Sequence, residues 1–255
     1  MRFVTLALLL LACAGRAEDL RLLSYNVRHG VNGANQPRFE RQCAVIKGTK
    51  PDVVGLQEID VNCRRSGSVD QTAAYAKATG TTGVFGKFMD YDGGQYGMAM
   101  LSRLKIVAQE VVRLPDGREP RVAVVLQVET AAGNRLQIAN VHFDWTTSEL
   151  RTPQAKALIA YLDKQPLPTI VLGDYNAEPG SPTLKLFSDA GFRFLEKPAD
   201  NRSTWSDTSR VLEIDHVAIR DSDSYRLIGK SITVLPEVDA SDHRPVTAVV
   251  HIEKR

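Results

Sequence analysis

The stretch PTIVLGDYNAEP, residues 168–179, places a short apolar run directly before a group of polar side chains. The run from Leu167 to Leu172 has the length of a strand and is bounded by turn-forming residues, so we predict a buried β-strand there. Asp174 and Asn176 follow at the point where this strand ends. The same junction between a buried strand and polar residues recurs along the chain.

Five further apolar segments meet polar residues at one end. Those residues are Asn26, Glu58, His142 with Asp144, Asp215 with His216, and Asp242 with His243. A single polar residue at a strand end is usually a cap or a turn. Six such clusters in one chain predict a shared pocket, because converging strand ends bring carboxylates, amides and imidazoles together.

The rest of the chain predicts one domain that is richer in strands than in helices. We expect strands at residues 18–27, 52–57, 98–101, 106–112, 122–128, 136–141, 167–172, 217–219, 232–234 and 246–250. We expect helices at residues 37–47, from a capping box at 68–71 to about 79, and at 147–163. Turn residues separate the runs between 98 and 141, which favours an antiparallel meander. Because helices and strands do not alternate strictly, the pattern disfavours Rossmann and TIM folds and favours an α+β or layered α/β sandwich.

The N-terminal residues have the layout of a secretory signal peptide. A basic start precedes the apolar run from Phe3 to Ala12, which is too short to span a bilayer, and small residues surround Arg16. We therefore expect a leader at 1–17, one domain at 18–255, and a periplasmic or secreted protein. A lipoprotein anchored at Cys13 and a buried N-terminal strand are the alternatives. No later stretch is long and apolar enough for a transmembrane helix.

Composition and charge limit the function classes. Hydrophobic residues make up 43% of the chain, which excludes disorder and a disulfide-dense scaffold. Lys and Arg total 32 and Asp and Glu total 30; removal of Arg2 and Arg16 with the leader leaves 30 of each. A nucleic-acid-binding protein usually carries a basic bias, so this class is not favoured. Cys43 and Cys63 either pair or remain buried free thiols.

The side chains of the predicted pocket indicate a type of chemistry. Glu58, Asp174 and Asp242 offer hard oxygen ligands, which suit Mg²⁺ or Mn²⁺ better than Zn²⁺, and neither HExxH nor CxxC occurs. His243 beside Asp215 forms a base held by a carboxylate. The remaining donors that could hold phosphoryl oxygens are Asn26, Asn176 and His142. Together these groups predict metal-dependent hydrolysis of a phosphoester.

An ordered set of motifs resembles the endonuclease/exonuclease/phosphatase superfamily, which includes DNase I-like nucleases, apurinic endonucleases, neutral sphingomyelinases, deadenylases and inositol polyphosphate 5-phosphatases. The motifs are SYNV (24–27), LQE (56–58), YGMAMLSR (96–103), NVHFD (140–144), GDYNAEP (173–179), EIDHV (213–217) and SDHRPV (241–246). The resemblance extends from about Leu20 to Ile252. It implies a four-layered α/β sandwich, in which two facing mixed β-sheets are flanked by helices.

The resemblance also implies roles for matching positions. Glu58 is expected to be the principal metal ligand, with Asn26 and Asp242 near the metal or its waters. Asp174 is expected to orient the attacking water or to assist the leaving group. Asn176 and His142 are expected to contact the scissile phosphate. His243, oriented by Asp215, is expected to act as base or as a transition-state donor.

Four basic residues are candidates for substrate binding. Arg28 follows Asn26 and either holds phosphate or forms a surface ion pair, and His29 either contacts phosphate or is structural. Arg64 and Arg65 lie a few residues beyond Glu58, in a loop similar to one in small bacterial members of the superfamily. They either clamp a second charged group of the substrate or form a solvated turn.

Two tryptophans lie next to polar residues of the predicted site. Trp145 follows Asp144, and Trp205 precedes Ser206. Their aromatic rings either line the rim of the pocket or make ordinary packing contacts.

Taken with the resemblance, these observations predict an exported, monomeric, Mg²⁺- or Mn²⁺-dependent phosphodiesterase acting on a small or lipid-linked phosphodiester. The connections between motifs are short, so little inserted surface is present for gripping DNA. A phosphomonoesterase and a secreted nuclease of the same fold are alternatives. A catalytically inactive module that binds phosphate or phospholipid is a rival from another class, but every residue with a predicted catalytic role is present.

Overall fold

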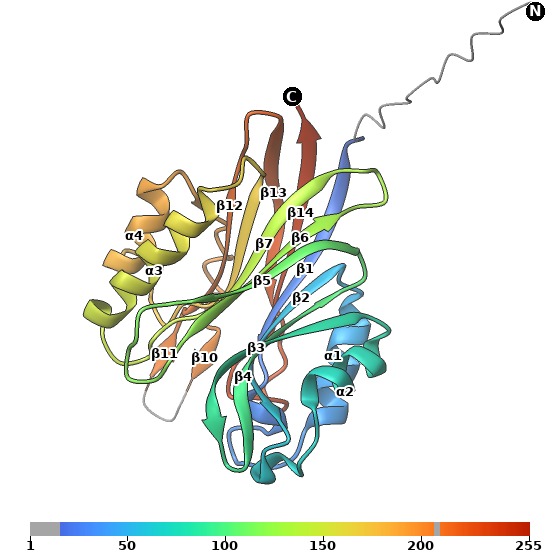
Figure 1. The fold of residues 1–255 in the computed structure, drawn as a ribbon, viewed down its shortest axis with the longest axis vertical. Helices are drawn as coiled ribbons and strands as arrows, with labels where there is room; N and C mark the ends of the chain where they lie inside the picture. Colours follow the sequence, from blue (N-terminus) through green and yellow to red (C-terminus); the bar gives the residue numbers. More distant parts are fainter. Residues whose placement is uncertain (1–15, 207–209) are drawn as a thin grey trace, which may run out of the picture.

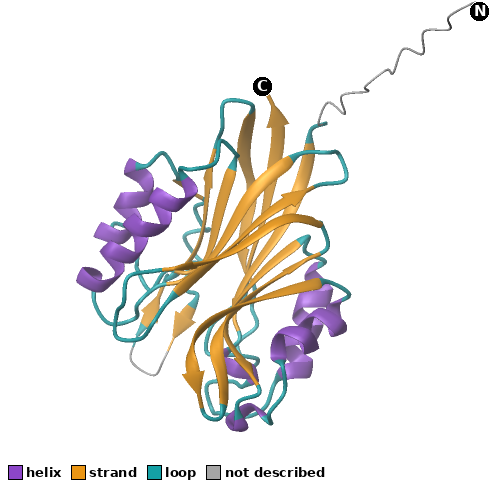
Figure 2. Cartoon of the chain, viewed as in Figure 1, coloured by secondary structure: helices purple, strands orange, loops and turns teal. Residues whose placement is uncertain are grey.

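The computed structural model describes residues 16–206 and 210–255, which form two facing β-sheets with helices outside them (Figure 1 and Figure 2). The first sheet has the strand order β13 (Tyr225–Val234), β14 (Val246–Lys254), β1 (Glu18–Asn26), β2 (Val53–Val61), β4 (Gly94–Ser102) and β3 (Thr82–Tyr91). The second has the order β5 (Lys105–Arg113), β6 (Val122–Glu129), β7 (Arg135–His142), β8 (Thr169–Asp174), β12 (Asp215–Arg220) and β9 (Arg193–Phe194). A separate pair is formed by β10 (Trp205–Ser206) and β11 (Val211–Leu212).

Helices cover the outer face of each sheet and complete the four layers (Figure 2). The first sheet carries α1 (Phe39–Thr49) and α2 (Gln71–Thr79), and the second carries α3 (Ser148–Leu162) and α4 (Pro182–Asp189). Each sheet is mixed, since β1 and β2 run parallel in one, β7 and β8 run parallel in the other, and the other pairings are antiparallel. The predicted layered sandwich is therefore confirmed.

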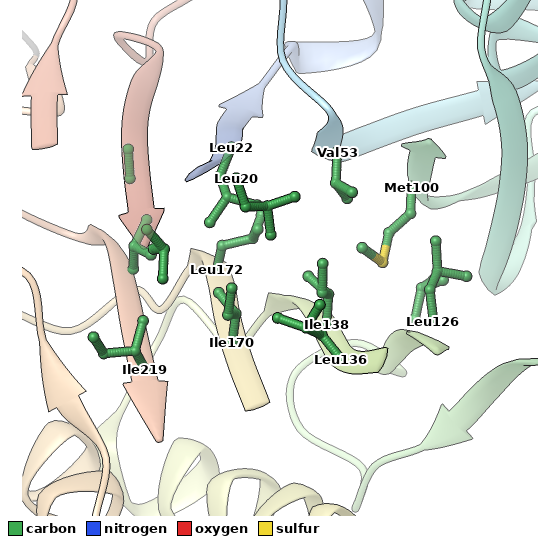
Figure 3. Packing of buried hydrophobic residues seen from close by; sticks show 14 of the residues in the cluster. Leu20, Leu22, Val53, Met100, Leu126, Leu136, Ile138, Ile170, Leu172 and Ile219 are labelled. Atoms are coloured by element: carbon green, nitrogen blue, oxygen red, sulfur yellow. The ribbon is translucent and has the colours of Figure 1, made fainter. Parts of the chain in front are cut away.

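The central core lies between the two sheets, where apolar side chains from both inner faces meet (Figure 3). Strand β1 shows the alternation that produces this core: Leu20 and Leu22 face the other sheet, whereas Leu23 and Tyr25 pack under the helices. The sheets approach closely at Gly55, where an added Cβ would lie 2.3 Å from Leu172 Cδ1. Both faces of β1 are buried, which explains its nearly continuous apolar sequence.

Two local predictions are wrong. Residues 98–141 do not form one meander, because β4 belongs to the first sheet whereas β5, β6 and β7 belong to the second. The capping box at 68–71 is not formed either: Ser68 has φ of +55°, and Asp70 caps α2 by accepting a hydrogen bond from the Ala73 amide. Strand β3, helix α4 and the edge strands β9, β10 and β11 were not predicted.

The predicted leader falls mainly on residues 1–15, outside the described part of the chain, and stays a prediction together with lipid attachment at Cys13. Among the described residues, no helix has the length and apolar character needed to cross a membrane. Cys43 and Cys63 are buried free thiols and do not pair with each other. Cys63 Sγ donates to the carbonyl oxygens of Tyr91 and Gln95 at 3.1 and 3.3 Å.

Candidate active site

The polar strand ends meet at one edge of the sandwich because of the strand directions. The parallel pair β7–β8 brings His142 and Asp174 to one end of the second sheet, and Asn26 at the end of β1 reaches them from the first sheet, where its Nδ2 donates to Asp174 Oδ2. Asp215 begins β12 and pairs in register with Asp174 across the antiparallel contact. His243 lies in the connection that enters β14, which is antiparallel to β1. The convergence predicted from the sequence is thus present.

A buried pair of side chains links His243 to Asp215. His243 Nδ1 lies 2.9 Å from Asp215 Oδ2, and His243 Nε2 lies 3.6 Å from Asp174 Oδ2. Burial lowers the pKa of His243, but the charges of Asp215 and Asp174 outweigh it and raise that pKa to about 10. The imidazole is therefore protonated at neutral pH in the protein without metal, and both ring nitrogens act as donors.

Asp174 lies at the centre of the site. Its Oδ1 accepts from the Asn176 amide at 2.9 Å, and its Oδ2 accepts from Asn26 Nδ2 at 3.3 Å. The Nε2 atom of His142 also lies 3.5 Å from Asp174 Oδ2. Burial, followed by the charge of Asp215, raises the pKa of Asp174 above its usual range. A carboxylate with a raised pKa can accept a proton near neutral pH.

A β-bulge directs Glu58 towards the site. The pairing of β2 with β4 skips Glu58 between Gln57 and Ile59, and Glu58 has φ of +59°. A left-handed conformation is strained for a residue other than glycine, and such strain is common at functional sites. Asn26 Nδ2 donates to Glu58 Oε1 at 3.0 Å, so the bulged carboxylate is held against the end of β1.

The residues predicted to hold a metal fit a hard divalent cation. Glu58 and Asp242 each have 24% of the side chain exposed, and burial followed by the charge of Asp242 raises the pKa of Glu58. A divalent cation would relieve this repulsion, and two carboxylates beside the Asn26 amide form an oxygen-rich donor set suited to Mg²⁺ or Mn²⁺. The ligand atoms of Asp174, Asp215 and His243 also lie within 4.8 Å of one another. In that second group His243 and Asp215 already hydrogen-bond each other, which favours proton chemistry.

His142 and Asn176 both line the cavity of the site. Burial, then the charge of Arg121, lowers the pKa of His142 well below its usual value, so this imidazole is neutral. Asn176 has φ of +50°, and its Nδ2 donates to the Phe143 carbonyl at 3.0 Å, which fixes the loop after β8. The predicted contact of these two residues with phosphate stays a prediction.

The four basic candidates for substrate binding lie in two different places. Arg28 Nη1 lies 3.6 Å from Asp242 Oδ2, and His29 Nδ1 lies 4.0 Å from Glu58 Oε2, so both stand beside the predicted metal ligands. Burial, followed by the charge of Arg65, lowers the pKa of His29 to about 4.

Arg64 and Arg65 pair with carboxylates that are not predicted metal ligands. Arg65 donates through Nε and Nη2 to the buried Asp60, both at 2.8 Å, and its guanidinium stacks on Tyr91. Arg64 pairs with Asp92 at 3.0 Å. Their guanidinium groups thus form ion pairs with Asp60 and Asp92, and none of the four basic candidates is among the residues that line the cavity.

The cavity has a volume of about 980 Å³, and some of the residues that line it had no role predicted from the sequence. Arg121, at the start of the apolar run of β6, is 1% exposed, pairs with Glu119 at 3.1 Å and lies over the Phe88 ring. A polar residue next to an apolar run is the signal that located the other site residues, and it could have located Arg121. Further lining residues not assigned are Tyr96, Arg151, Glu178, Ser181 and Arg210. Both tryptophans, Trp145 and Trp205, line the cavity.

Solved structures with the same fold include proteins of several descriptions. A conserved protein of unknown function from Enterococcus faecalis V583 is 19% identical, with a TM-score of 0.76 over 92% of this chain and 100% of that chain. The Bacteroides thetaiotaomicron mannosyl-6-phosphatase is 20% identical, with a TM-score of 0.72 over 92% of this chain and 99% of that one. The human Nocturnin catalytic domain with bound sulfate is 21% identical, with a TM-score of 0.70 over 95% and 97%.

A search of curated protein sequences found no match. The model of the Endonuclease/Exonuclease/phosphatase family matches residues 23–243, which contain every strand end that contributes a side chain to the site. The family match and the shared architecture agree with the arrangement of Glu58, Asp174 and His243 around one cavity. The chain belongs to the Endonuclease/Exonuclease/phosphatase family.

Proposed function

We propose that the protein is an exported, divalent-metal-dependent phosphodiesterase that hydrolyses a small or lipid-linked phosphodiester. The observation that carries this proposal is the convergence of two groups on one cavity: a buried His243–Asp215 pair facing Asp174, and the carboxylates of Glu58 and Asp242. The first group suits proton transfer and charge stabilisation, and the second suits a metal. Phosphoester hydrolysis needs both.

The residues of the chain divide the reaction between them. A cation held by Glu58, Asp242 and Asn26 would supply Lewis-acid polarisation of the phosphoryl group. Asp174, with its raised pKa, accepts a proton from the attacking water. Protonated His243, held by Asp215, donates from Nε2 to the phosphoryl oxygen on which charge develops.

The volume of the cavity supports a substrate larger than a phosphate group. About 980 Å³ is near the upper end of the range for small-molecule sites. A diester carries an organic group on each side of phosphorus, and the cavity walls come from segments on both sheets, including Tyr96 of β4 and Trp145 after β7.

Hydrolysis of bis-(p-nitrophenyl) phosphate and of p-nitrophenyl phosphate tests the proposal. The protein is assayed with Mg²⁺, with Mn²⁺ and with EDTA, beside the His243→Ala variant. Metal-dependent cleavage of the diester that is lost in the variant supports a phosphodiesterase. A preference for the monoester would instead favour a phosphatase, an activity that the similar Bacteroides structure carries in its name. Turnover of neither compound, nor of plasmid DNA or sphingomyelin, would contradict the proposed function.

Export is tested separately from catalysis. N-terminal sequencing of the protein recovered from the periplasm or the medium should give a chain that begins at Glu18. Incorporation of radiolabelled lipid at Cys13 would identify the lipoprotein form instead. A full-length chain confined to the cytoplasm would contradict export. Sedimentation of the purified protein as a single 28 kDa or smaller species checks the proposed monomer.

A further inference from the structure

The active-site cavity continues beyond the catalytic residues along the segment that connects β7 to α3. Trp145, Thr146, Ser148 and Arg151 from this segment line the same cavity as Asp174 and His243. We call Trp145 and Arg151 the Arg151 subsite. None of the predicted catalytic roles uses either residue.

Arg151 forms no direct ion pair with a carboxylate of the described residues. Its Nη1 donates to the Asp144 carbonyl at 3.0 Å, and its Nε is buried without a hydrogen-bond partner. Within residues 16–206 and 210–255, no carboxylate oxygen lies within 4.0 Å of its guanidinium nitrogens. The Asp144 carboxylate is nearby but is occupied by the backbone amides of Thr146 and Arg118.

Arg121 shows the contrasting case on another wall of the cavity. Its Nη2 lies 3.1 Å from Glu119 Oε2, so a carboxylate of the chain offsets its charge, although its Nε and Nη1 are buried without hydrogen-bond partners. A half-buried guanidinium without such a partner has lost part of its hydration and gains most from an incoming anion. Asp144, Asp174 and Glu149 act on the charge of Arg151 only from beyond ion-pair distance, so of these two arginines Arg151 is the one whose guanidinium has no direct carboxylate contact among the described residues.

Trp145 adds an apolar surface next to this cation. Trp145 is 58% exposed, so most of its indole is accessible to a ligand. An exposed indole at the rim of a cavity can stack on a planar or ring-shaped group. The subsite thus combines one stacking surface with one unpaired cation.

We propose that the Arg151 subsite binds a second phosphate group of the substrate, carried on a ring that lies against Trp145. This inference rests on the proposed function, since the subsite extends from the phosphoester site. The guanidinium donates through Nη2 to a terminal oxygen of that phosphate. The substrate class is accordingly a phosphoester that bears a second phosphate on a ring-containing group.

Direct binding tests the inference without relying on turnover. Isothermal titration calorimetry with Mg²⁺ compares thymidine 3′,5′-bisphosphate with thymidine 5′-phosphate, two ligands that differ only in the second phosphate. Because the second phosphate adds a charge-assisted hydrogen bond, we expect the bisphosphate to bind roughly 10- to 150-fold more tightly. Arg151→Gln should abolish this preference, and Arg151→Lys should retain part of it.

The controls separate this inference from the proposed function. Arg226→Gln removes an exposed arginine on β13, outside the active-site cavity, and should keep the full preference. Trp145→Ala should weaken both ligands by a similar factor. Equal binding of the two ligands by the unmodified protein, or a preserved preference in Arg151→Gln, would overturn the inference. A preserved preference in the unmodified protein without turnover of bis-(p-nitrophenyl) phosphate would count against the proposed function alone.

Discussion

The contact between Asp215 and His243 gives a quantitative prediction for the Asp215→Asn variant. The two side chains are 1% and 5% exposed as residues, and 2.9 Å separates Asp215 Oδ2 from His243 Nδ1. Asn keeps the shape of the side chain but removes the charge that raises the pKa of His243. A hydrogen bond to a charged group contributes about 1.5–3 kcal/mol, so kcat should fall roughly 10- to 150-fold.

A double-mutant cycle tests whether Asp215 acts through His243. His243→Ala should lower kcat by about 10²–10⁴. Because Asp215 has no imidazole to hold in that background, Asp215→Asn should cause a smaller further loss there, one that reflects only its effect on the pKa of Asp174. Rates are measured with bis-(p-nitrophenyl) phosphate at saturating Mg²⁺. Asp223→Asn, on an exposed turn, is the matched control and should retain full activity.

The pH profile provides a second test of the same pair. His243 acts as a cation, and its pKa of about 10 keeps it protonated through neutral pH. Removing the charge of Asp215 lowers that pKa, so the activity of Asp215→Asn should begin to fall at a lower pH on the alkaline side. The reasoning is refuted if Asp215→Asn lowers kcat by the same factor with and without His243, or if the alkaline limb does not move.

Three further perturbations have outcomes that follow from single contacts. Glu58→Gln removes the charge that faces Asp242, so the Mg²⁺ concentration for half-maximal activity should rise at least about tenfold; an unchanged metal titration would contradict this. Leu172→Ala opens a cavity between the sheets and should cost about 2–5 kcal/mol in urea unfolding, and a cost below about 1 kcal/mol would speak against the packing. Burial, then the charge of Lys197, lowers the pKa of His216 from 6.5 to about 3. Between these two pKa values the unfolded chain binds the proton more readily than the folded chain does, so the stability present above pH 6.5 is lost as the pH falls. His216→Gln should make the free energy of unfolding depend less on pH in this range. Parallel curves of stability against pH for the two proteins would contradict this role of His216.

Much of the site could be predicted because its signals are local. Each strand is a short apolar run, and each functional side chain lies within a few residues of its end, as Asp174 does after β8 and His142 does at the end of β7. The sheet then needs only parallel neighbours to bring those ends together. Motif order along the chain, together with this pattern, was enough to predict both the layered sandwich and the residues that converge.

Other features depend on pairing between distant segments and have no local signal. The run at 98–101 looks like its neighbours at 106–112, yet β4 pairs with β2 and β5 pairs with β6 in a different sheet. Apolar alternation records which side chains are buried but not which sheet buries them.

The conformation of single side chains also depended on tertiary contacts. The bulge that redirects Glu58 arises from the register of β2 against β4. Arg65 forms an ion pair with the buried Asp60, although the surrounding sequence resembles an exposed basic turn. Arg151 shows the reverse, since the folded chain places its guanidinium in the active-site cavity without a carboxylate partner from residues 16–206 or 210–255.

The sequence by itself thus determined most of the central strands, the polar residues at their ends and the chemistry that these residues share, because burial and residue type are properties of short segments. Only the tertiary structure decided the β-bulge at Glu58, the ion pair between Arg65 and Asp60, the lack of a carboxylate partner for Arg151 among the described residues, and the pKa shifts of Asp174 and His243. Charge pairing and desolvation depend on distances between groups far apart in the chain, and those distances exist only in the packed state.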